Sequence, residues 1–276
     1  MFIELNVLTV SGVDRMFHFQ HKTALITGAS SGIGEAFAEQ LAQQQCNLVI
    51  VARRQDRLES LKAKLEQQHG IKVTVISSDL AQPSASASIY QQLKTLGIEV
   101  DILINNAGIG HHGAFLDVPA AQHLSMLAIN IHALTELTHL FASDMKARGQ
   151  GGAILLVASI AAFTPIPQFA TYAASKAYVL SLGQALNKEL KNDHIGVTVL
   201  APGGVATEFM AASGQHIDDW RTKAIMTAEA VARESLDALA KGKAVIVPGL
   251  LNKASSLFLA HAPNAVTMTL GEMATS

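Results

Sequence analysis

A tyrosine, a lysine and a serine at defined spacings are the residues of this sequence best suited to catalysis. Tyr172 and Lys176 stand four positions apart in Y-A-A-S-K, and Ser159 lies 13 residues before the tyrosine. Positions i and i+4 share one helix face, so a helix here puts the Lys176 ammonium beside the phenol. That charge is expected to lower the phenol pKa from about 10 toward neutrality, where a general acid or base works best. Tyrosine and lysine at this spacing are also common as a surface pair, so the motif alone does not establish catalysis.

A glycine-rich turn near the beginning of the chain is a second motif. The segment Lys22–Thr27, K-T-A-L-I-T, predicts a buried strand, and a helical pattern with Phe37 and Leu41 begins after the turn. A strand, a glycine-rich turn and a helix together bind a dinucleotide, because backbone N–H groups and the helix N-terminus face the pyrophosphate. No lysine follows the last glycine, which argues against a nucleoside-triphosphate loop; an ordinary turn is the other interpretation. The turn residues expected to contact the cofactor are Gly28, Ser30, Ser31, Gly32, Ile33 and Gly34.

Five motifs follow one another in an order that indicates a family. They are T-G-A-S-S-G-I-G, N-N-A-G at 105–108, Ser159, Y-A-A-S-K and P-G-G-V-A-T at 202–207. Their order and spacing resemble the classical short-chain dehydrogenase/reductase (SDR) family across about residues 20–250. The resemblance implies a Rossmann-like, seven-stranded parallel sheet in the order 3-2-1-4-5-6-7. It also implies an enzyme that interconverts a carbonyl and a secondary alcohol.

The resemblance assigns roles to four residues. Tyr172 is expected to supply the proton that the alkoxide needs after hydride transfer, and Ser159 to hydrogen-bond the carbonyl oxygen. Lys176 is expected to lower the phenol pKa and to hold the hydroxyls of the nicotinamide ribose. Asn130, in A-I-N-I-H, occupies the position of a family asparagine that holds a water beside the lysine. Asparagine within an apolar helical stripe is otherwise unfavourable, which supports a specific role.

The end of the second predicted strand favours NADP(H) over NAD(H). An acidic residue there would bind the ribose 2′-hydroxyl and repel a 2′-phosphate, but the sequence has V-A-R-R at 51–54. Arg53 and Arg54 can hold a phosphate through charge-assisted hydrogen bonds, and the family pairs a basic residue at the position of Arg53 with NADP(H). The alternative is that two surface arginines begin a solvated helix, which suits Arg54 better than Arg53.

Further cofactor contacts follow from the resemblance. Asp79 corresponds to the family aspartate that holds the adenine amino group, although a helix N-cap would look the same. Asn105 and Asn106 fit a role in tying strands together better than a role in chemistry. Val205 and Thr207 correspond to the anchor of the nicotinamide carboxamide, against the alternative of a plain turn and cap. The remaining expected contacts are Asn106, Ala107, Gly108, Pro202 and Gly203, together with Tyr172 and Lys176.

Alternation of short apolar runs with helical patterns predicts an α/β fold, a doubly wound parallel sheet with right-handed crossovers. The predicted strands are Lys22–Thr27, Asn47–Val51, Lys72–Ile76, Val100–Ile104, Ala153–Val157, Gly196–Leu200 and Ala244–Val247. Three helices are marked by Leu58, Leu61 and Leu65; by Leu124, Leu127, Ile131, Leu134, Phe141 and Met145; and by Val179, Leu186 and Leu190. Residues 16–276 are predicted to form a single catalytic domain. Residues 1–15 lack the features of a signal peptide and are set apart as an N-terminal extension of uncertain origin.

Composition argues against several classes of protein. The chain has 276 residues, of which 49% are hydrophobic and 15% charged, as suits a parallel sheet buried on both faces. The net charge of −2 gives no electrostatic reason to bind nucleic acid or an anionic membrane. The uncharged stretch 151–175 contains Pro165 and Pro167, which favours a strand, loop and helix over a membrane span. The single Cys46 fits a reducing, cytoplasmic location, and no cluster of residues at ligand spacing predicts a metal site.

The substrate pocket is predicted to be apolar. Its walls are expected from the loop after Gly108, the loop 160–169 and the stretch after Thr207, which supply Phe115, Phe163, Phe169, Phe209, Met210 and Trp220. No basic cluster indicates a phosphopantetheine or coenzyme A tail. The C-terminal stretch 250–276 is expected to cover either the cleft or a subunit contact.

Apolar positions outside the main stripes of two helices predict a homodimer or homotetramer. Leu137, Leu140, Leu180 and Leu182 would need cover, which a second copy of the same face supplies by two-fold symmetry. The alternative is that these leucines pack within the subunit.

A dinucleotide-sensing regulatory protein on the same fold is the alternative function. Such a sensor needs no general acid, so the joint presence of Asn130, Ser159, Tyr172 and Lys176 favours the enzyme.

Overall fold

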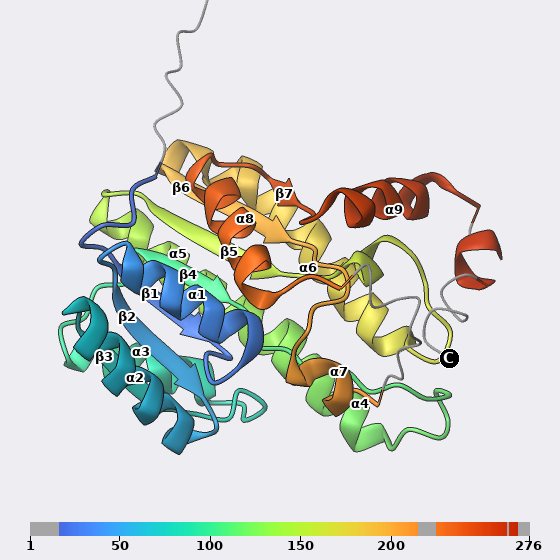
Figure 1. Cartoon of the computed structure of the whole chain (residues 1–276), viewed down its shortest axis with the longest axis horizontal. Helices are drawn as coiled ribbons and strands as arrows, with labels where there is room; N and C mark the ends of the chain where they lie inside the picture. The colour runs from blue at the N-terminus through green and yellow to red at the C-terminus, as the bar shows by residue number, and fades with distance from the viewer. Residues whose placement is uncertain (1–16, 215–224, 264, 270–276) are drawn as a thin grey trace, which may run out of the picture.

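The computed structural model describes residues 17–214, 225–263 and 265–269. Within these residues, strands pair in parallel to form a seven-stranded sheet in the order β3-β2-β1-β4-β5-β6-β7 (Figure 1), which confirms the order that the family resemblance implied. Each predicted strand is present, with its ends shifted by at most two residues. The strands are β1 Thr23–Thr27, β2 Asn47–Ala52, β3 Val73–Ser77, β4 Ile102–Asn105, β5 Gly152–Val157, β6 Ile195–Leu200 and β7 Val245–Ile246.

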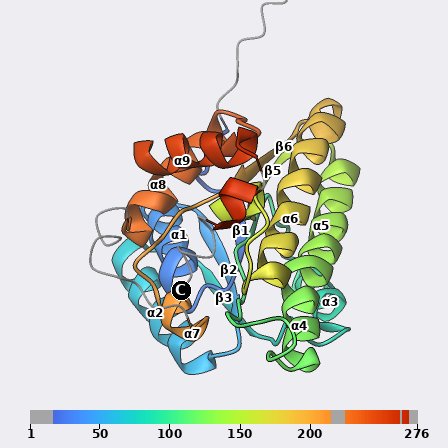
Figure 2. The same ribbon diagram turned by 90° about the vertical axis from the view of Figure 1, so that its right-hand side faces the viewer.

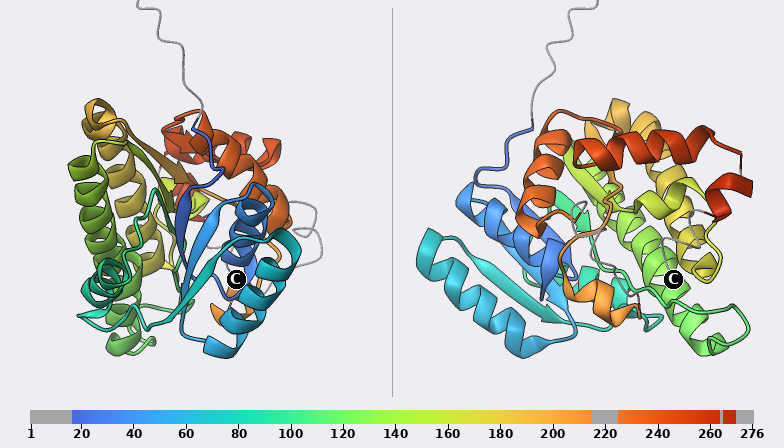
Figure 3. Two further views of the ribbon diagram at one scale, coloured as in Figure 1. Left: turned by 90° about the vertical axis from the view of Figure 1, so that its left-hand side faces the viewer. Right: turned by 45° about the vertical axis from the view of Figure 1, so that its right-hand side comes forward.

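Two layers of helices enclose the sheet, as Figures 2 and 3 show. One layer contains α1 Gly32–Gln43, α2 Gln55–His69 and α8 Ala228–Ala240. The other contains α3 Ala85–Thr95, α5 Leu134–Arg148 and α6 Ala170–Glu189. Every residue of β5 is buried, because both faces of a parallel sheet are covered. The three leucines that marked α2 are also buried, as their spacing predicted.

The remaining elements connect these layers or lie at the edge of the sheet. They are α4 Ala120–Leu127, the π-helical segment η1 Ala128–Ala133, the 3₁₀ turns η2 Ile160–Phe163 and η3 Leu190–Asp193, and the helices α7 Glu208–Ala212 and α9 Leu250–His261.

The long helix predicted around Asn130 is interrupted by a π-helical segment. It runs through α4, η1 and α5 without a break in the chain's helical course. A π turn inserts a residue into the α-helical repeat, so the apolar stripe before it rotates around the helix. The prediction that Leu124 belongs to the buried stripe is therefore wrong: this residue is 66% exposed, and Met126 is buried instead. Segments of this kind are frequent at functional sites, and Asn130 lies within this one.

The leucines expected to need cover from a second subunit are mostly covered already. Leu137 is fully buried, and Leu180 and Leu182 pack against the same core cluster. The outward-facing role predicted for Leu137 is wrong, because α5 turns this residue toward the sheet. Leu140 is half-buried. Packing within the subunit, the alternative that the sequence left open, accounts for most of these side chains.

The uncharged stretch 151–175 forms a strand, a loop and the start of a helix, as predicted. β5, η2 and the first turns of α6 occupy it in that order. Across the described residues, none of the helices is long and apolar enough to cross a membrane. The N-terminal extension 1–15, Trp220 of the predicted pocket wall and the last seven residues of the C-terminal stretch lie outside the described residues.

Candidate active site

A cleft of about 1230 Å³ lies at the carboxyl ends of the strands, the usual ligand site of a doubly wound sheet. Its lining includes the residues that directly follow β1 through β5 and, two residues after the end of β6, Pro202. The predicted site residues that line it are Gly28, Ser30, Ser31, Gly32, Ile33, Arg53, Asp79, Asn106, Ala107, Gly108, Ser159, Tyr172, Lys176, Pro202, Gly203, Val205 and Thr207. The predicted Gly34 and Asn130 do not belong to this lining.

The turn after β1 is shaped by glycines that a larger residue would disrupt. Gly28 has φ +68°, and a Cβ atom there would lie 2.8 Å from the Asn106 amide nitrogen. Gly32 has φ +59°, and its Cβ would lie 2.9 Å from Cγ2 of Thr207. A Cβ on Gly34 would overlap the Gly28 carbonyl oxygen, so this glycine lets α1 pack against the turn and does not face the cleft. The turn thus brings bare backbone to the cleft, which a bound pyrophosphate requires.

The two asparagines of N-N-A-G tie neighbouring elements together, as predicted. The Asn106 side chain donates to the Thr27 carbonyl at 2.9 Å and so joins the end of β4 to β1. Asn105 donates to Thr138 Oγ1 on α5 at 2.9 Å. Asp79 lines the cleft while its carboxylate accepts a backbone N–H two residues further on at 3.1 Å. Asp79 thus caps a turn and is not the helix N-cap that was its alternative, because α3 begins at Ala85 with Ser84 as its N-cap; its adenine contact stays a prediction.

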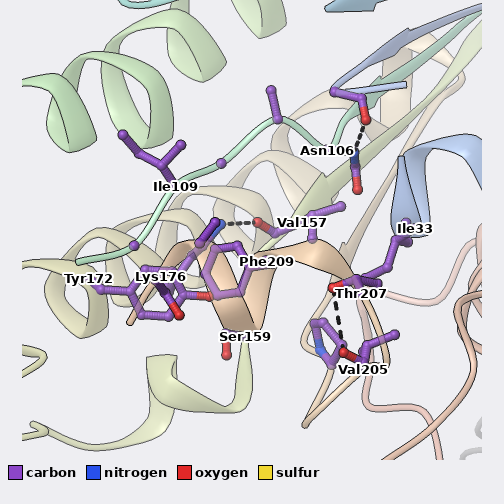
Figure 4. Close-up of a pocket in the computed structure, with 18 of the residues that line it drawn as sticks. Ile33, Asn106, Ile109, Val157, Ser159, Tyr172, Lys176, Val205, Thr207 and Phe209 are labelled. Atoms are coloured by element: carbon purple, nitrogen blue, oxygen red, sulfur yellow. Dashed lines mark hydrogen bonds between the residues drawn. The ribbon is translucent and has the colours of Figure 1, made fainter. Parts of the chain in front are cut away.

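Ser159, Tyr172 and Lys176 lie together in the cleft (Figure 4). Tyr172 and Lys176 are one turn apart on α6, and both are buried. Lys176 Nζ donates to the Val157 carbonyl at 2.8 Å and lies 5.6 Å from the centre of the Tyr172 ring. Ser159 caps η2, and its Oγ accepts the Ala161 N–H at 3.2 Å. Polar side chains from the end of β5 and from α6 therefore converge in one place.

The electrostatics of the tyrosine and lysine differ from the sequence-based expectation. Burial disfavours the phenolate and raises the pKa of Tyr172 to about 12, although the Ser159 hydroxyl, a hydrogen-bond partner of the phenol, acts in the opposite direction. Burial also disfavours the ammonium and lowers the pKa of Lys176 to about 8. The prediction of a phenol pKa near neutrality is wrong for this arrangement, because desolvation is the larger effect. The phenol is protonated at neutral pH and is suited to donating a proton.

Asn130 positions the segment after β4 and does not face the cleft. Its side chain is fully buried, and its amide exchanges two hydrogen bonds with the backbone of Ile109, each 3.0 Å long. Its nitrogen also donates to Ser175 Oγ on α6 at 3.1 Å. A Cβ on Gly108 would lie 3.3 Å from the Asn130 oxygen and 3.2 Å from Lys176 Nζ, so the N-N-A-G segment passes between them. The Asn130 side chain thus has three protein hydrogen bonds, and its role in holding a water beside Lys176 stays a prediction.

Aromatic side chains cover Tyr172. Phe169 stacks on Tyr172 with ring centres 4.3 Å apart, and the Phe209 ring lies 5.6 Å from the Tyr172 ring. Gly110 contacts both phenylalanines, because a Cβ there would lie 2.9 Å from the tip of Phe169 and 3.0 Å from the tip of Phe209. Together with Met210, these two predicted wall residues line the cleft.

Two other predicted wall residues do not line the cleft. Phe115 is 61% exposed and stacks on His123, with ring centres 4.7 Å apart. Phe163 packs against the core cluster that α3, α5 and α6 form with the sheet. Both residues belong to segments that reach the site, but the loops turn these side chains away from it. An irregular loop has no repeat from which the direction of a side chain could be predicted.

The C-terminal helix α9 completes the substrate side of the cleft. Thr164, in the loop after β5, donates to Thr267 Oγ1 at 2.7 Å and so joins that loop to the chain beyond α9. The tail thus covers the cleft, one of the two roles predicted for it, while Leu250 and Leu251 remain exposed. The residues of α9 that line the cleft are Ala254, Ser255, Phe258 and Leu259.

The two arginines after β2 both line the cleft but differ in their contacts. Arg53 is exposed, and within the described residues its guanidinium has no hydrogen-bond or ion-pair partner. Arg54 donates to Ser30 Oγ at 3.1 Å, to Ser31 Oγ at 2.8 Å and to a Glu208 oxygen at 2.8 Å. Arg54 directly precedes α2, as the alternative of a solvated helix start requires. Its guanidinium nevertheless binds the side chains of the glycine-rich turn. Glu208 is not among the predicted site residues. Its partner Arg54 is 154 positions away in the chain, and an acid directly after Thr207 is the only local sign of it.

Comparison with known proteins relates most of the chain to one family model. The model described as short chain dehydrogenase matches residues 22–218. The very-long-chain 3-oxoacyl-CoA reductase of Phaeosphaeria nodorum is 40% identical over 174 residues, which cover 61% of this chain and 50% of that protein. This chain therefore spans about half the length of that relative.

Similar solved structures hold either nicotinamide cofactor. A short-chain dehydrogenase from Sphingobium yanoikuyae in complex with NADPH is 32% identical and has a TM-score of 0.77, covering 88% of this chain and 97% of that chain. A short-chain dehydrogenase/reductase from Burkholderia phymatum in complex with NAD is 26% identical and has a TM-score of 0.79, covering 88% of this chain and 94% of that chain.

Proposed function

Because the chain belongs to the short-chain dehydrogenase family, we propose that it is an NADP(H)-dependent oxidoreductase that interconverts a carbonyl and a secondary alcohol on an apolar substrate. The observation that carries this proposal is the meeting of Ser159, Tyr172 and Lys176 in the cleft that the glycine-rich turn also lines. A buried proton donor beside a dinucleotide cradle is what carbonyl reduction requires.

The side chains of the cleft divide the work of the proposed reaction. The bound nicotinamide would supply the hydride that carbonyl reduction requires. Tyr172 donates its phenolic proton to the carbonyl oxygen, which gains negative charge as the reaction proceeds, and its pKa of about 12 keeps the phenol protonated until then. Ser159 donates a hydrogen bond to the same oxygen. Lys176, fixed by the Val157 carbonyl, uses its remaining N–H donors for the ribose hydroxyls.

We propose NADP(H) as the cofactor in preference to NAD(H). β2 ends at Ala52, and no acidic residue stands at this end of the strand. The two residues that follow, Arg53 and Arg54, both line the cleft. Guanidinium groups bind phosphate through paired, charge-assisted hydrogen bonds, and the ribose 2′-phosphate is what distinguishes NADP(H). Similar structures hold NADPH or NAD, so the family alone does not decide between the two cofactors. The proposal of NADP(H) therefore rests on these two arginines.

An apolar carbonyl compound is the substrate class that the cleft supports best. Large apolar side chains line the cleft near Tyr172 and at α9. They are Phe169, Phe209, Met210 and Phe258. The relative from Phaeosphaeria nodorum is named for a very-long-chain 3-oxoacyl substrate, which is in keeping with an apolar cleft.

A panel of apolar ketones and secondary alcohols, followed at the nicotinamide absorbance, tests the proposed function. We expect turnover of at least one carbonyl with NADPH and slower turnover with NADH. Tight NADPH binding without turnover on the whole panel would contradict the enzyme and favour the dinucleotide sensor.

We further propose a homodimer or homotetramer in the cytoplasm. Support for association comes from the family, whose members commonly pair through the two long helices, since the leucines of α5 and α6 are largely covered within the subunit. Light scattering at micromolar concentration should give a multiple of the mass of one chain, and cell fractionation should recover the protein without membranes. The mass of a single chain would contradict the oligomer, and recovery with membranes would contradict the cytoplasmic location.

A further inference from the structure

The head group of Arg54 is divided between the glycine-rich turn and an acidic residue. Its Nε and Nη2 atoms donate to Ser30 Oγ at 3.3 and 3.1 Å, and Nη2 donates to Ser31 Oγ at 2.8 Å. Its Nη1 atom donates to Glu208 at 2.8 Å. A guanidinium has five N–H donors, so little of this one is free for another ligand.

Glu208 is held by two arginines at once. Its second oxygen accepts a hydrogen bond from Arg57 Nη1 at 2.6 Å. The hydrogen bond from Arg57 and then that from Arg54 lower the pKa of Glu208 to about 2, so the residue is a carboxylate at any pH near neutrality. The Glu208 side chain is 53% exposed, and neither ion pair is shielded from water. It is consequently the partner of Arg54 that is released most easily.

The carboxylate begins α7, a helix that reaches the catalytic tyrosine. Glu208 is followed directly by Phe209, whose ring lies beside the ring of Tyr172 in Figure 4. At the other end of α7, the Ser213 carbonyl accepts the His112 N–H at 2.9 Å. α7 thus spans the cleft, from the arginines after β2 to the segment after β4.

We propose that Glu208 competes with the ribose 2′-phosphate of the cofactor for Arg54. Through this competition, binding of the phosphate loosens α7. The inference rests on the proposed NADP(H) function. A ribose 2′-phosphate and the Glu208 carboxylate are anions that use the same guanidinium donors, and two anions side by side repel each other. Binding of the phosphate therefore displaces Glu208 from Arg54, and at the end that carries Phe209 the Glu208 carboxylate of α7 keeps only its hydrogen bond from Arg57. A cofactor without the 2′-phosphate leaves the attachment in place.

Two adenine nucleotides separate the effect of the 2′-phosphate from the rest of the cofactor. Adenosine 2′,5′-bisphosphate carries this phosphate and adenosine 5′-monophosphate lacks it. By titration calorimetry, we expect Glu208→Gln to bind the bisphosphate roughly three- to fivefold more tightly than the wild type, the effect of no longer having to break a surface ion pair. The monophosphate should bind the two proteins equally.

Glu39→Gln is the matched control, because it removes the same charge from an ion pair between α1 and α2. It should leave both affinities unchanged. If the wild type binds the two nucleotides equally, the NADP(H) preference itself fails. If the wild type prefers the bisphosphate but Glu208→Gln does not strengthen that preference, the inference about Glu208 is wrong and the proposed function stands. If Glu39→Gln gained as much affinity for the bisphosphate as Glu208→Gln, the change in net charge would explain the effect. That result would also contradict the inference.

Hydrogen exchange of residues 208–214 tests the coupling to α7. In the wild type, the bisphosphate should raise the exchange of this segment severalfold, and the monophosphate should not. In Glu208→Gln, exchange should already be raised without ligand and should rise no further. Unchanged or slower exchange in the wild type with the bisphosphate would contradict the release of α7.

Discussion

The cofactor side and the substrate side of the cleft are built in different ways. On the cofactor side, the chain segments pack closely. The Asn106 side chain donates to the Thr27 carbonyl at 2.9 Å, and a Cβ on Gly28 would collide with the Asn106 side chain and the Ala107 backbone. The substrate side consists of side chains on loops and short helices, and none of the five residues of α7 is fully buried. Segments with little burial open at low free-energy cost. The cofactor side is therefore rigid and intolerant of substitution, whereas the substrate side can adapt to its ligand.

Tyr172→Phe separates chemistry from cofactor binding and should have the largest effect. Loss of the phenolic proton should lower turnover by roughly 10³-fold, within the range for a general acid. NADPH affinity, followed by the fluorescence of the bound cofactor, should stay nearly unchanged because the rigid cofactor side keeps its shape. Turnover close to that of the wild type would contradict the assignment of Tyr172.

The pH dependence of unfolding tests the burial of Lys176. Because its pKa is lowered to about 8, the unfolded chain binds more protons than the folded one between pH 8 and the ordinary lysine pKa. Stability of the wild type should therefore rise between pH 8 and pH 10, by up to about 3 kcal/mol relative to Lys176→Met. The raised pKa of Tyr172 acts only above about pH 10, where it lowers stability. Urea unfolding of both proteins at pH 7.5 and pH 10 measures the difference, and parallel curves would contradict a buried ammonium.

Arg53→Asp tests the choice of cofactor on the rigid side. An aspartate there repels a 2′-phosphate and can accept a hydrogen bond from a 2′-hydroxyl, so the preference should move toward NADH. The loss of NADPH affinity should be about 2 kcal/mol, roughly thirtyfold. Dissociation constants for NADPH and NADH that do not change would show that the phosphate lies elsewhere.

Features contained in one short stretch of chain could be predicted from the sequence. The burial of β1, the glycine-rich turn and the pairing of Tyr172 with Lys176 on α6 depend on residues within a few positions of one another. A tie between neighbouring strands through an asparagine of N-N-A-G also follows from the family motif, and the structure identifies the pair as Asn106 and Thr27.

Features that depend on distant segments could not be predicted. The pKa of Tyr172 is raised by burial beneath Phe169 and Phe209, which approach from separate segments. The pairing of Glu208 with Arg54 joins residues 154 positions apart. The π-helical turn that buries Asn130 and exposes Leu124 has no marker in an apolar helical pattern. All three involve residues of the substrate side or of its supports, where side-chain packing decides the geometry.

A pair of glycine substitutions compares the two sides directly and should have the smallest effects. Gly28→Ala places a side chain at φ +68° against Asn106, and should cost about 1–2 kcal/mol of stability and weaken NADPH binding. In Gly110→Ala the nearest atoms to the new Cβ belong to the rings of Phe169 and Phe209, which can shift. It should cost under about 1 kcal/mol and change KM for the substrate without changing NADPH affinity. Urea unfolding and cofactor titration measure both, and equal losses in the two variants would contradict the difference between the sides.

Transfer of deuterium from NADPH labelled at the transferable C4 position to a carbonyl substrate tests the central claim most directly. Mass spectrometry of the product locates the label. The proposed reaction predicts an alcohol with deuterium on the carbinol carbon, formed rapidly by the wild type and far more slowly by Tyr172→Phe at the same cofactor occupancy. An alcohol without deuterium at that carbon, or a labelled alcohol formed equally fast by Tyr172→Phe, would contradict hydride transfer assisted by this tyrosine.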